Sequence, residues 1–180
     1  MFNLSALAGA EKPKTFTIAD EGVYLGSISD CEVKESQAGR SYIKYRINLT
    51  DVDGNKKGVL FEMLHPESES NFCAYRIKVL LEALGYDLAE LTDSMSCADL
   101  IDLIDKRDVT VFVKHVPDEY RISKGQKDAI KLDLDDNYNY FAAADDYDTW
   151  YSNLNGGAEN TASDETDFIT VDEDGELPFI

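Results

Sequence analysis

The feature that most constrains the fold is a change of hydrophobic period along the chain. From Ser41 to Val52 apolar and polar residues alternate one by one, which predicts a β-strand with one buried face. The apolar members are Ile43, Tyr45, Ile47 and Leu49, and the polar members are Tyr42, Lys44, Arg46 and Asn48. From Glu69 to Gly85 the apolar residues instead recur every three or four positions, which predicts a helix that ends at Gly85.

The same reasoning, applied along the chain, predicts three strands, a helical segment and two more strands. The expected strands are residues 22–34, 41–52, 57–65, 108–116 and 129–141, and the expected helices are residues 69–85 and 98–105. Ser96 and Asp99 have the spacing of a capping box at the start of the second helix. Gly26 interrupts the first strand, where we expect a bulge or a bend.

This order of elements predicts a mainly β fold. Five strands with a helical insert between the third and the fourth is the order of the five-stranded oligonucleotide/oligosaccharide-binding (OB) barrel. An SH3-like barrel would lack the insert, and a Rossmann fold would need alternating helices. We therefore expect an N-terminal arm at residues 1–20, an OB-like domain at residues 21–144 and a C-terminal tail at residues 145–180.

The tail combines two properties that rarely occur together. It contains eleven Asp or Glu residues and no Lys or Arg, and its middle is rich in Asn, Gly, Ser and Thr, which predicts a flexible, disordered segment. Its end is nevertheless apolar, which predicts a docking peptide that acidic residues steer to a basic partner surface. The expected partner-binding residues are Asp172, Glu173, Asp174, Glu176, Leu177, Pro178, Phe179 and Ile180. The alternative interpretation is an acidic tail that serves solubility alone.

Composition and motifs limit the chemistry. The formal net charge is −19, which argues against an unspecific polycation. No P-loop, G-x-G-x-x-G, G-x-S-x-G or H-E-x-x-H motif occurs, so we expect neither an enzyme nor a cofactor. Cys31, Cys73 and Cys97 form no metal-binding spacing, which predicts buried, reduced thiols without a metal site. With no signal peptide and no apolar run of membrane-spanning length, we expect a cytoplasmic protein without a membrane partner.

Two basic clusters stand out in this acidic chain. Residues 34–57 hold six basic residues against three acidic ones, and a second basic group surrounds the connection between the last two expected strands. In an OB barrel these two regions line one groove, where cations neutralise phosphates and aromatic rings stack on bases. The expected nucleic-acid-binding residues are Lys34, Arg40, Tyr42, Lys44, Arg46, Lys56, Lys57, Lys114, Tyr120, Arg121, Lys124, Lys127 and Lys131. The alternative is that these are ordinary solvated side chains.

At this level the chain resembles the single-stranded DNA-binding proteins of bacteriophages. The resemblance is carried by the OB-like pattern and by the terminal sequence from Asp172 to Phe179, because bacterial single-stranded DNA-binding proteins have a similar acidic tip that ends in Pro-Phe. In that family the tip recruits replication, recombination and repair enzymes. Here Ile180 follows Phe179, which favours docking to a virus's own polymerase, helicase or recombinase over docking to host enzymes.

The resemblance implies a non-enzymatic protein that coats single-stranded DNA without reading its sequence, in the cytoplasm of a bacterial host if it is viral. We expect the tail to occupy the DNA groove until DNA displaces it. The sequence leaves open whether the protein is a homo-oligomer and whether it prefers DNA to RNA. Two alternatives remain: an acidic DNA mimic or regulator that binds a cationic protein, and an enzyme subunit without catalytic residues of its own.

Overall fold

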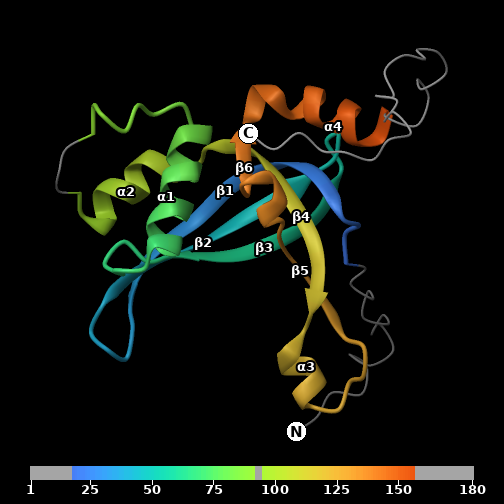
Figure 1. Ribbon diagram of the computed structural model, residues 1–180, viewed down its shortest axis with the longest axis horizontal. Helices are drawn as coiled ribbons and strands as arrows, with labels where there is room; N and C mark the ends of the chain where they lie inside the picture. Colours follow the sequence, from blue (N-terminus) through green and yellow to red (C-terminus); the bar gives the residue numbers. More distant parts are fainter. Residues whose placement is uncertain (1–17, 92–94, 157–180) are drawn as a thin grey trace, which may run out of the picture.

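The computed structural model describes residues 18–91 and 95–156 and contains one antiparallel β-sheet with a few helices (Figure 1). Its strands are β1 (Gly22–Glu35), β2 (Ser41–Thr50), β3 (Lys56–Leu64), β4 (Asp108–Pro117), β5 (Ile130–Leu134) and β6 (Phe141–Ala143). They follow the order β3-β2-β1-β4-β5, and β6 pairs with β4. The prediction of a mainly β fold with helices between β3 and β4 is confirmed. The sheet is open, however, because no pairing of β3 with β5 occurs among the described residues, so the closed barrel is not confirmed.

The core lies on one face of the sheet, which we call the inner face. Helices α1 (Asn71–Ala83) and α2 (Cys97–Ile104) cover it with side chains such as Leu80 and Ile104. Both helices agree with the expected positions. The predicted capping box of α2 is present, with Ser96 and Asp99 each accepting a hydrogen bond from the other's backbone N–H. Gly85 follows α1 with a φ of 83°, a left-handed conformation that suits glycine.

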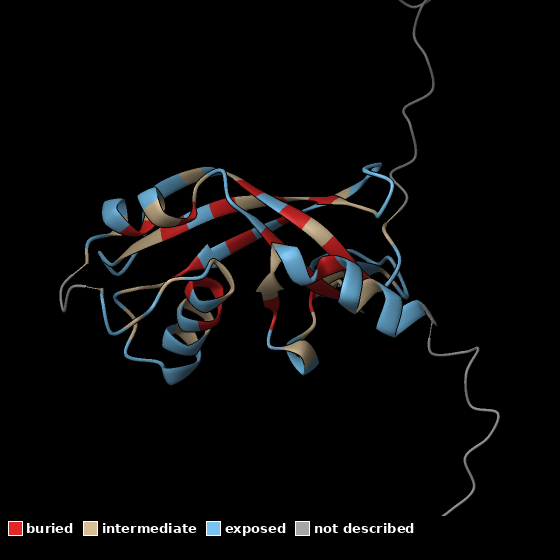
Figure 2. Cartoon of the chain, turned by 90° about the horizontal axis from the view of Figure 1, so that it is seen from above, coloured by how far each residue is buried: buried red, intermediate tan, exposed pale blue. Residues whose placement is uncertain are grey.

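The opposite, outer face of the sheet is covered only in part. Helix α4 (Tyr147–Gly156) packs there on β1 and β4, where Tyr147 is buried and Trp150 meets Phe112 edge to face at 5.1 Å. Ordered structure therefore continues through α4 to Gly156, past the expected domain boundary at Asp145. The spaced aromatic residues of α4 bury enough apolar surface to order this acidic stretch. Buried residues alternate with more exposed ones along β2 and β3, whereas residues 109–113 of β4 are all buried; Figure 2 shows the chain coloured by burial.

Two details of the strands differ from expectation. The irregularity of β1 lies between Ser29 and Glu32, where Asp30 has a φ of 54°, and not at Gly26. Gly26 instead permits close packing, because a Cβ there would lie 2.3 Å from Cγ2 of Val111. The last expected strand is divided into β5, a 3₁₀ turn η2 (Asp136–Tyr138) and β6. A further 3₁₀ turn, η3 (Ala144–Asp146), leads into α4.

The connection between β4 and β5, expected as a loop, contains the short helix α3 (Glu119–Ser123). It lies at the tip of an arm formed by β4 and β5, which extends away from α1 and α2 (Figure 1). The three cysteines are half-buried and form no disulfide, and burial, with a contribution from Asp105, raises the pKa of Cys31 to about 12. None of the described helices has the length and apolar character needed to cross a membrane.

Candidate nucleic-acid interface

The uncovered part of the outer face lies on β2 and β3, and we call it the β2–β3 face. β2 contributes every second residue, as its alternation predicts, and β3 contributes the residues that pair with them. Arg46 lies opposite Phe61, and Lys44 lies opposite Met63. The β2–β3 face consists of Tyr42, Lys44, Arg46, Val59, Phe61 and Met63.

The β3 half of this face is apolar although it faces solvent. Phe61 is 67% exposed, Met63 48% and Val59 44%. The intervening Glu62, the one charged residue in the middle of the strand, points instead to the inner face and is 8% exposed. Leu60 and Leu64 are buried on the inner face as usual, but a strand ordinarily exposes its charges and does not expose three apolar residues. Exposed apolar side chains grouped in this way indicate a binding surface.

A buried ion pair compensates for the burial of the Glu62 charge. The carboxylate of Glu62 accepts a hydrogen bond from the guanidinium of Arg76 on α1, and both side chains are largely shielded from solvent. The Arg76 guanidinium also lies over the Tyr140 ring, 5.4 Å from its centroid. Burial raises the pKa of Glu62 above its ordinary value, while Arg76 acts in the opposite direction. A distant helix thus supplies the partner that allows β3 to turn Phe61 outward.

The first predicted basic cluster is spread along β1, β2 and β3. Lys44 lies with its ammonium 5.7 Å from the centroid of the exposed Phe61 ring, so a cation and an aromatic surface are adjacent. Tyr42 stacks on His65 with ring centroids 5.4 Å apart. Arg46 forms an ion pair with Asp30 at 2.9 Å. Within this cluster Lys44 is therefore the cation that lies beside an exposed aromatic ring.

The remaining members of this cluster lie at the ends of the strands. Lys34 is on the outer face of β1 but pairs with Glu32 at 2.7 Å, and Arg40 lies in the turn before β2. Lys56 and Lys57 lie at the other end of the β2–β3 hairpin. The hydrogen bond from Lys57 to Asp51 lowers the pKa of that carboxyl to about 2. Half of the six cations of this cluster, Lys34, Arg46 and Lys57, are thus paired with carboxylates.

The second predicted cluster lies on the β4–β5 arm. Tyr120 on α3 is 73% exposed, with the Lys124 ammonium 5.7 Å from its ring centroid. Arg121 pairs with Asp118 at 3.5 Å, and Lys131 pairs with Asp133 at 3.5 Å. Lys127 lies in the connection between α3 and β5.

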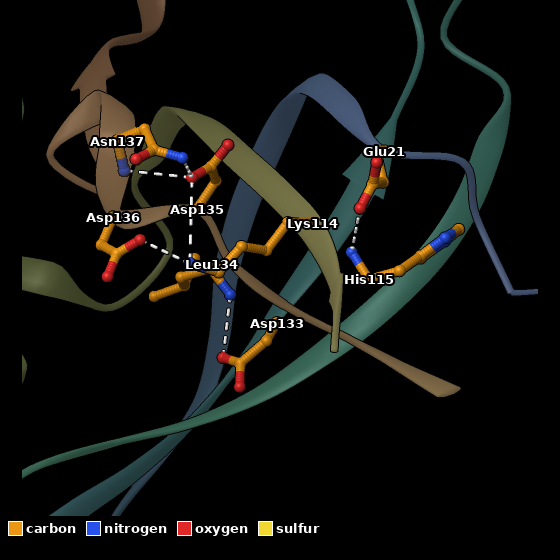
Figure 3. A network of polar contacts seen from close by, with 8 residues as sticks. All are labelled: Glu21, Lys114, His115, Asp133, Leu134, Asp135, Asp136 and Asn137. Carbon is orange, nitrogen blue, oxygen red and sulfur yellow. Dashed lines mark hydrogen bonds and ion pairs between the residues drawn. The ribbon is translucent and has the colours of Figure 1, made fainter. Parts of the chain in front are cut away.

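Lys114 has a different environment from the rest of this cluster. It projects from β4 toward Asp136, with which it forms an ion pair, and its ammonium is 4.0 Å from the carboxylate of Asp135 (Figure 3). It lines a separate hollow of about 440 Å³ together with His115 and Tyr138. Lys114 therefore stabilises the turn after β5 and does not belong to the β2–β3 face.

A groove of about 650 Å³ between β3 and β5 brings the apolar half of the β2–β3 face close to part of the second cluster. It is lined on one side by Val59, Phe61 and Met63 and on the other by Arg121 and Lys131. Tyr120, Lys124 and Lys127 of the arm are not among the residues that line it. The groove thus connects Val59, Phe61 and Met63 to Arg121 and Lys131, but it includes neither the cations of the first cluster nor the rest of the second.

Sequence reasoning identified Tyr42, Lys44 and Arg46 but missed Phe61, Met63 and Val59. From Gly58 to Leu64 the residues on both faces of the strand are largely apolar, so alternation does not show which face is exposed. The charge on Glu62 favours exposure of its own face, which is in fact the buried one.

The predicted partner-binding residues 172–180 lie outside the described residues. Among the residues that the structure does describe, no group of three or more His, Cys, Asp or Glu side chains is arranged to hold a metal ion.

These observations define a class of protein: a small antiparallel sheet that presents an exposed aromatic surface beside cationic side chains. The chain matches no protein-family model and no curated protein.

Proposed function

We propose that the protein binds single-stranded DNA, without sequence preference, on the β2–β3 face. The observation that supports this most directly is the outward-facing Phe61 ring with the Lys44 ammonium beside it. An exposed ring can stack on any base, and an adjacent cation neutralises the phosphate that follows, so the pair suits a strand of any sequence. Met63 and Val59 extend the apolar surface on either side of Phe61.

The fold is compatible with this proposal. The strand order β3-β2-β1-β4-β5, with helices between β3 and β4, is that of an OB barrel that is not closed between its third and fifth strands. We propose that the protein is an opened OB-type body of the kind found in bacteriophage single-stranded DNA-binding proteins. In this proposal the acidic tail, beyond the described residues, recruits replication or recombination proteins.

The electrostatic part of the proposal predicts that Lys44→Gln reduces the salt dependence of binding. None of the ion pairs found within the described part of the chain includes Lys44, so its charge is available to a phosphate. Loss of one phosphate contact lowers the slope of log K against log salt by about 0.7 for a single strand. Fluorescence anisotropy of a labelled poly-dT oligonucleotide across a salt series measures this slope. Lys57→Gln is the control, because Lys57 already pairs with Asp51 at 2.8 Å. An equal decrease of this slope in both variants would contradict the assignment of Lys44 as a phosphate contact.

The tail part of the proposal predicts tighter binding after truncation. A chain of residues 1–156 keeps every described element but loses the acidic segment that we expect to compete for the cationic face. We expect its affinity for poly-dT to rise on the order of tenfold at low salt, because a tethered competitor acts at high effective concentration. A full-length variant with Asn and Gln in place of the carboxylates after Gly156 should behave like the truncation. Equal binding by the truncated and full-length chains would refute tail competition but not DNA binding.

One observation favours a second candidate function, that of an acidic DNA mimic or regulator that binds a cationic protein. Lys34, Arg46, Lys57, Lys114, Arg121 and Lys131 all pair with carboxylates of the same chain. This pairing leaves the net charge of −19 to dominate the field around the molecule. If neither the full-length chain nor residues 1–156 binds poly-dT at low salt, this second function becomes the better one.

A further inference from the structure

Two strand edges face each other across the groove without pairing. Within the described ranges β3 pairs only with β2, and β5 pairs only with β4. The groove between them is lined by the apolar side chains of Phe61, Met63 and Ile130. A free apolar edge of this kind can bind an additional strand, because its backbone N–H and C=O groups are unpaired and its side chains are uncovered.

The chain itself enters this groove at its first described residues. Ile18 and Ala19 line the groove, and the Ala19 carbonyl accepts a hydrogen bond from Nε2–H of His115 at 2.7 Å. The carboxylate of Glu21 accepts a hydrogen bond from the backbone N–H of His115 (Figure 3). A Cβ placed on Gly58 would lie 3.8 Å from Cβ of Ala19. These contacts fix the polypeptide beside the beginning of β3.

The residues before Ala19 have the pattern of an edge strand. Thr15, Phe16, Thr17 and Ile18 alternate between polar and apolar and are all residue types that favour strands. β3 begins at Lys56, so most of its free edge beyond Gly58 extends toward Leu64. A segment that runs back from Ala19 along this edge is antiparallel to β3, and counting from Ala19 opposite Gly58 places Phe16 opposite Phe61.

We propose that residues 14–17, which lie outside the described residues, bind along the free edge of β3 as an antiparallel strand, with Phe16 against Phe61. The segment then extends the apolar surface of β3, because opposite residues of an antiparallel pair project to the same face and Phe16 stands beside Phe61 without covering that ring. It also places Lys14 beside Met63 at the margin of the β2–β3 face.

The charges in the groove favour this segment over the acidic tail as the occupant. Six charged side chains line the groove and all of them pair with one another: Glu62 with Arg76, Asp118 with Arg121, and Asp133 with Lys131. A groove without an unpaired charge suits the uncharged Thr-Phe-Thr-Ile sequence. The tail tip would bring carboxylates that find no free cation there.

Hydrogen exchange of the full-length protein, measured by mass spectrometry without nucleic acid, tests this proposal. In Phe16→Asp we expect amides in residues 58–64 to exchange roughly tenfold faster or more than in the unmodified chain, because the added strand is lost. Phe2→Asp, which changes the other aromatic residue of the arm, should leave this exchange unaltered. Exchange in residues 43–49 of β2 should be the same in all three proteins, which verifies that the sheet remains folded.

Two results would overturn the proposal. Identical exchange of residues 58–64 in all three proteins would mean that the arm does not bind this edge. Protection that persists in Phe16→Asp and increases with protein concentration would assign the edge to a second copy of the chain. Because no nucleic acid is present, neither result bears on the proposed DNA binding.

Discussion

Phe61→Ala is expected to weaken binding of poly-dT by about 1–3 kcal/mol, the range measured for loss of one stacked base. This corresponds to a roughly 5- to 150-fold increase in Kd. The side chain is 67% exposed, so its removal takes away a platform without opening a cavity in the core. Fluorescence anisotropy with labelled poly-dT measures the effect, and the thermal unfolding midpoint should change little.

Phe72→Ala provides a matched control. Phe72 is also an exposed phenylalanine, at 55%, but it lies on α1 and packs edge to face on Tyr140 at 6.1 Å, away from Lys44. We expect it to leave the affinity unchanged, while Phe61→Trp should retain most of it because a larger ring still stacks. Equal losses in Phe61→Ala and Phe72→Ala would indicate a general effect of surface aromatic residues and would contradict the β2–β3 face as the site.

Local patterns in the sequence were sufficient for the elements whose structure depends on neighbours in the chain. The strict alternation of β2 correctly placed Tyr42, Lys44 and Arg46 on the outer face. Ser96 and Asp99 correctly marked the start of α2, because both partners of a capping box lie within one turn. These predictions required no knowledge of long-range contacts.

The orientation of β3 could not be derived in this way. Placing Glu62 inside is tolerable only because Arg76, on a helix later in the chain, pairs with it. A sequence pattern contains no information about that contact, so the sequence alone does not show which face of β3 is exposed. The pairing of Arg46 with Asp30 was hidden for the same reason. Lys34 and Lys131 pair with Glu32 and Asp133, only two residues away, and there the count of basic residues failed because it does not show which charges are neutralised.

The Glu62–Arg76 pair gives the largest effect on stability that we expect. Arg76→Met keeps an apolar side chain of similar length but leaves the Glu62 carboxylate buried without its cation. Loss of one partner from a buried pair destabilises a protein by about 3–5 kcal/mol. Urea unfolding monitored by circular dichroism measures this loss near neutral pH. The double variant Glu62→Gln/Arg76→Met should recover much of it, because the uncompensated charge is then absent.

Lys78→Met is the control on the same helix. Lys78 pairs with Glu82 at 3.7 Å, but both side chains are about half exposed, so the free energy of unfolding should change by less than about 0.5 kcal/mol. A comparable loss of unfolding free energy in Lys78→Met and Arg76→Met would mean that the loss comes from helix propensity and not from the buried pair.

The pH dependence of Arg76→Met identifies Glu62 as the cause of the loss. Burial raises the folded-state pKa of Glu62 and Arg76 lowers it, so removing Arg76 should raise that pKa further. A carboxyl with a higher pKa in the folded state than in the unfolded state binds more protons when folded, and stability therefore falls as the pH rises through the folded-state value. We expect Arg76→Met to lose more stability at mildly alkaline pH than at acidic pH, because protonation of Glu62 removes the uncompensated buried charge. Adding Glu62→Gln should abolish this difference, and a deficit that is the same at both pH values in Arg76→Met would exclude an uncompensated Glu62 carboxylate as its origin.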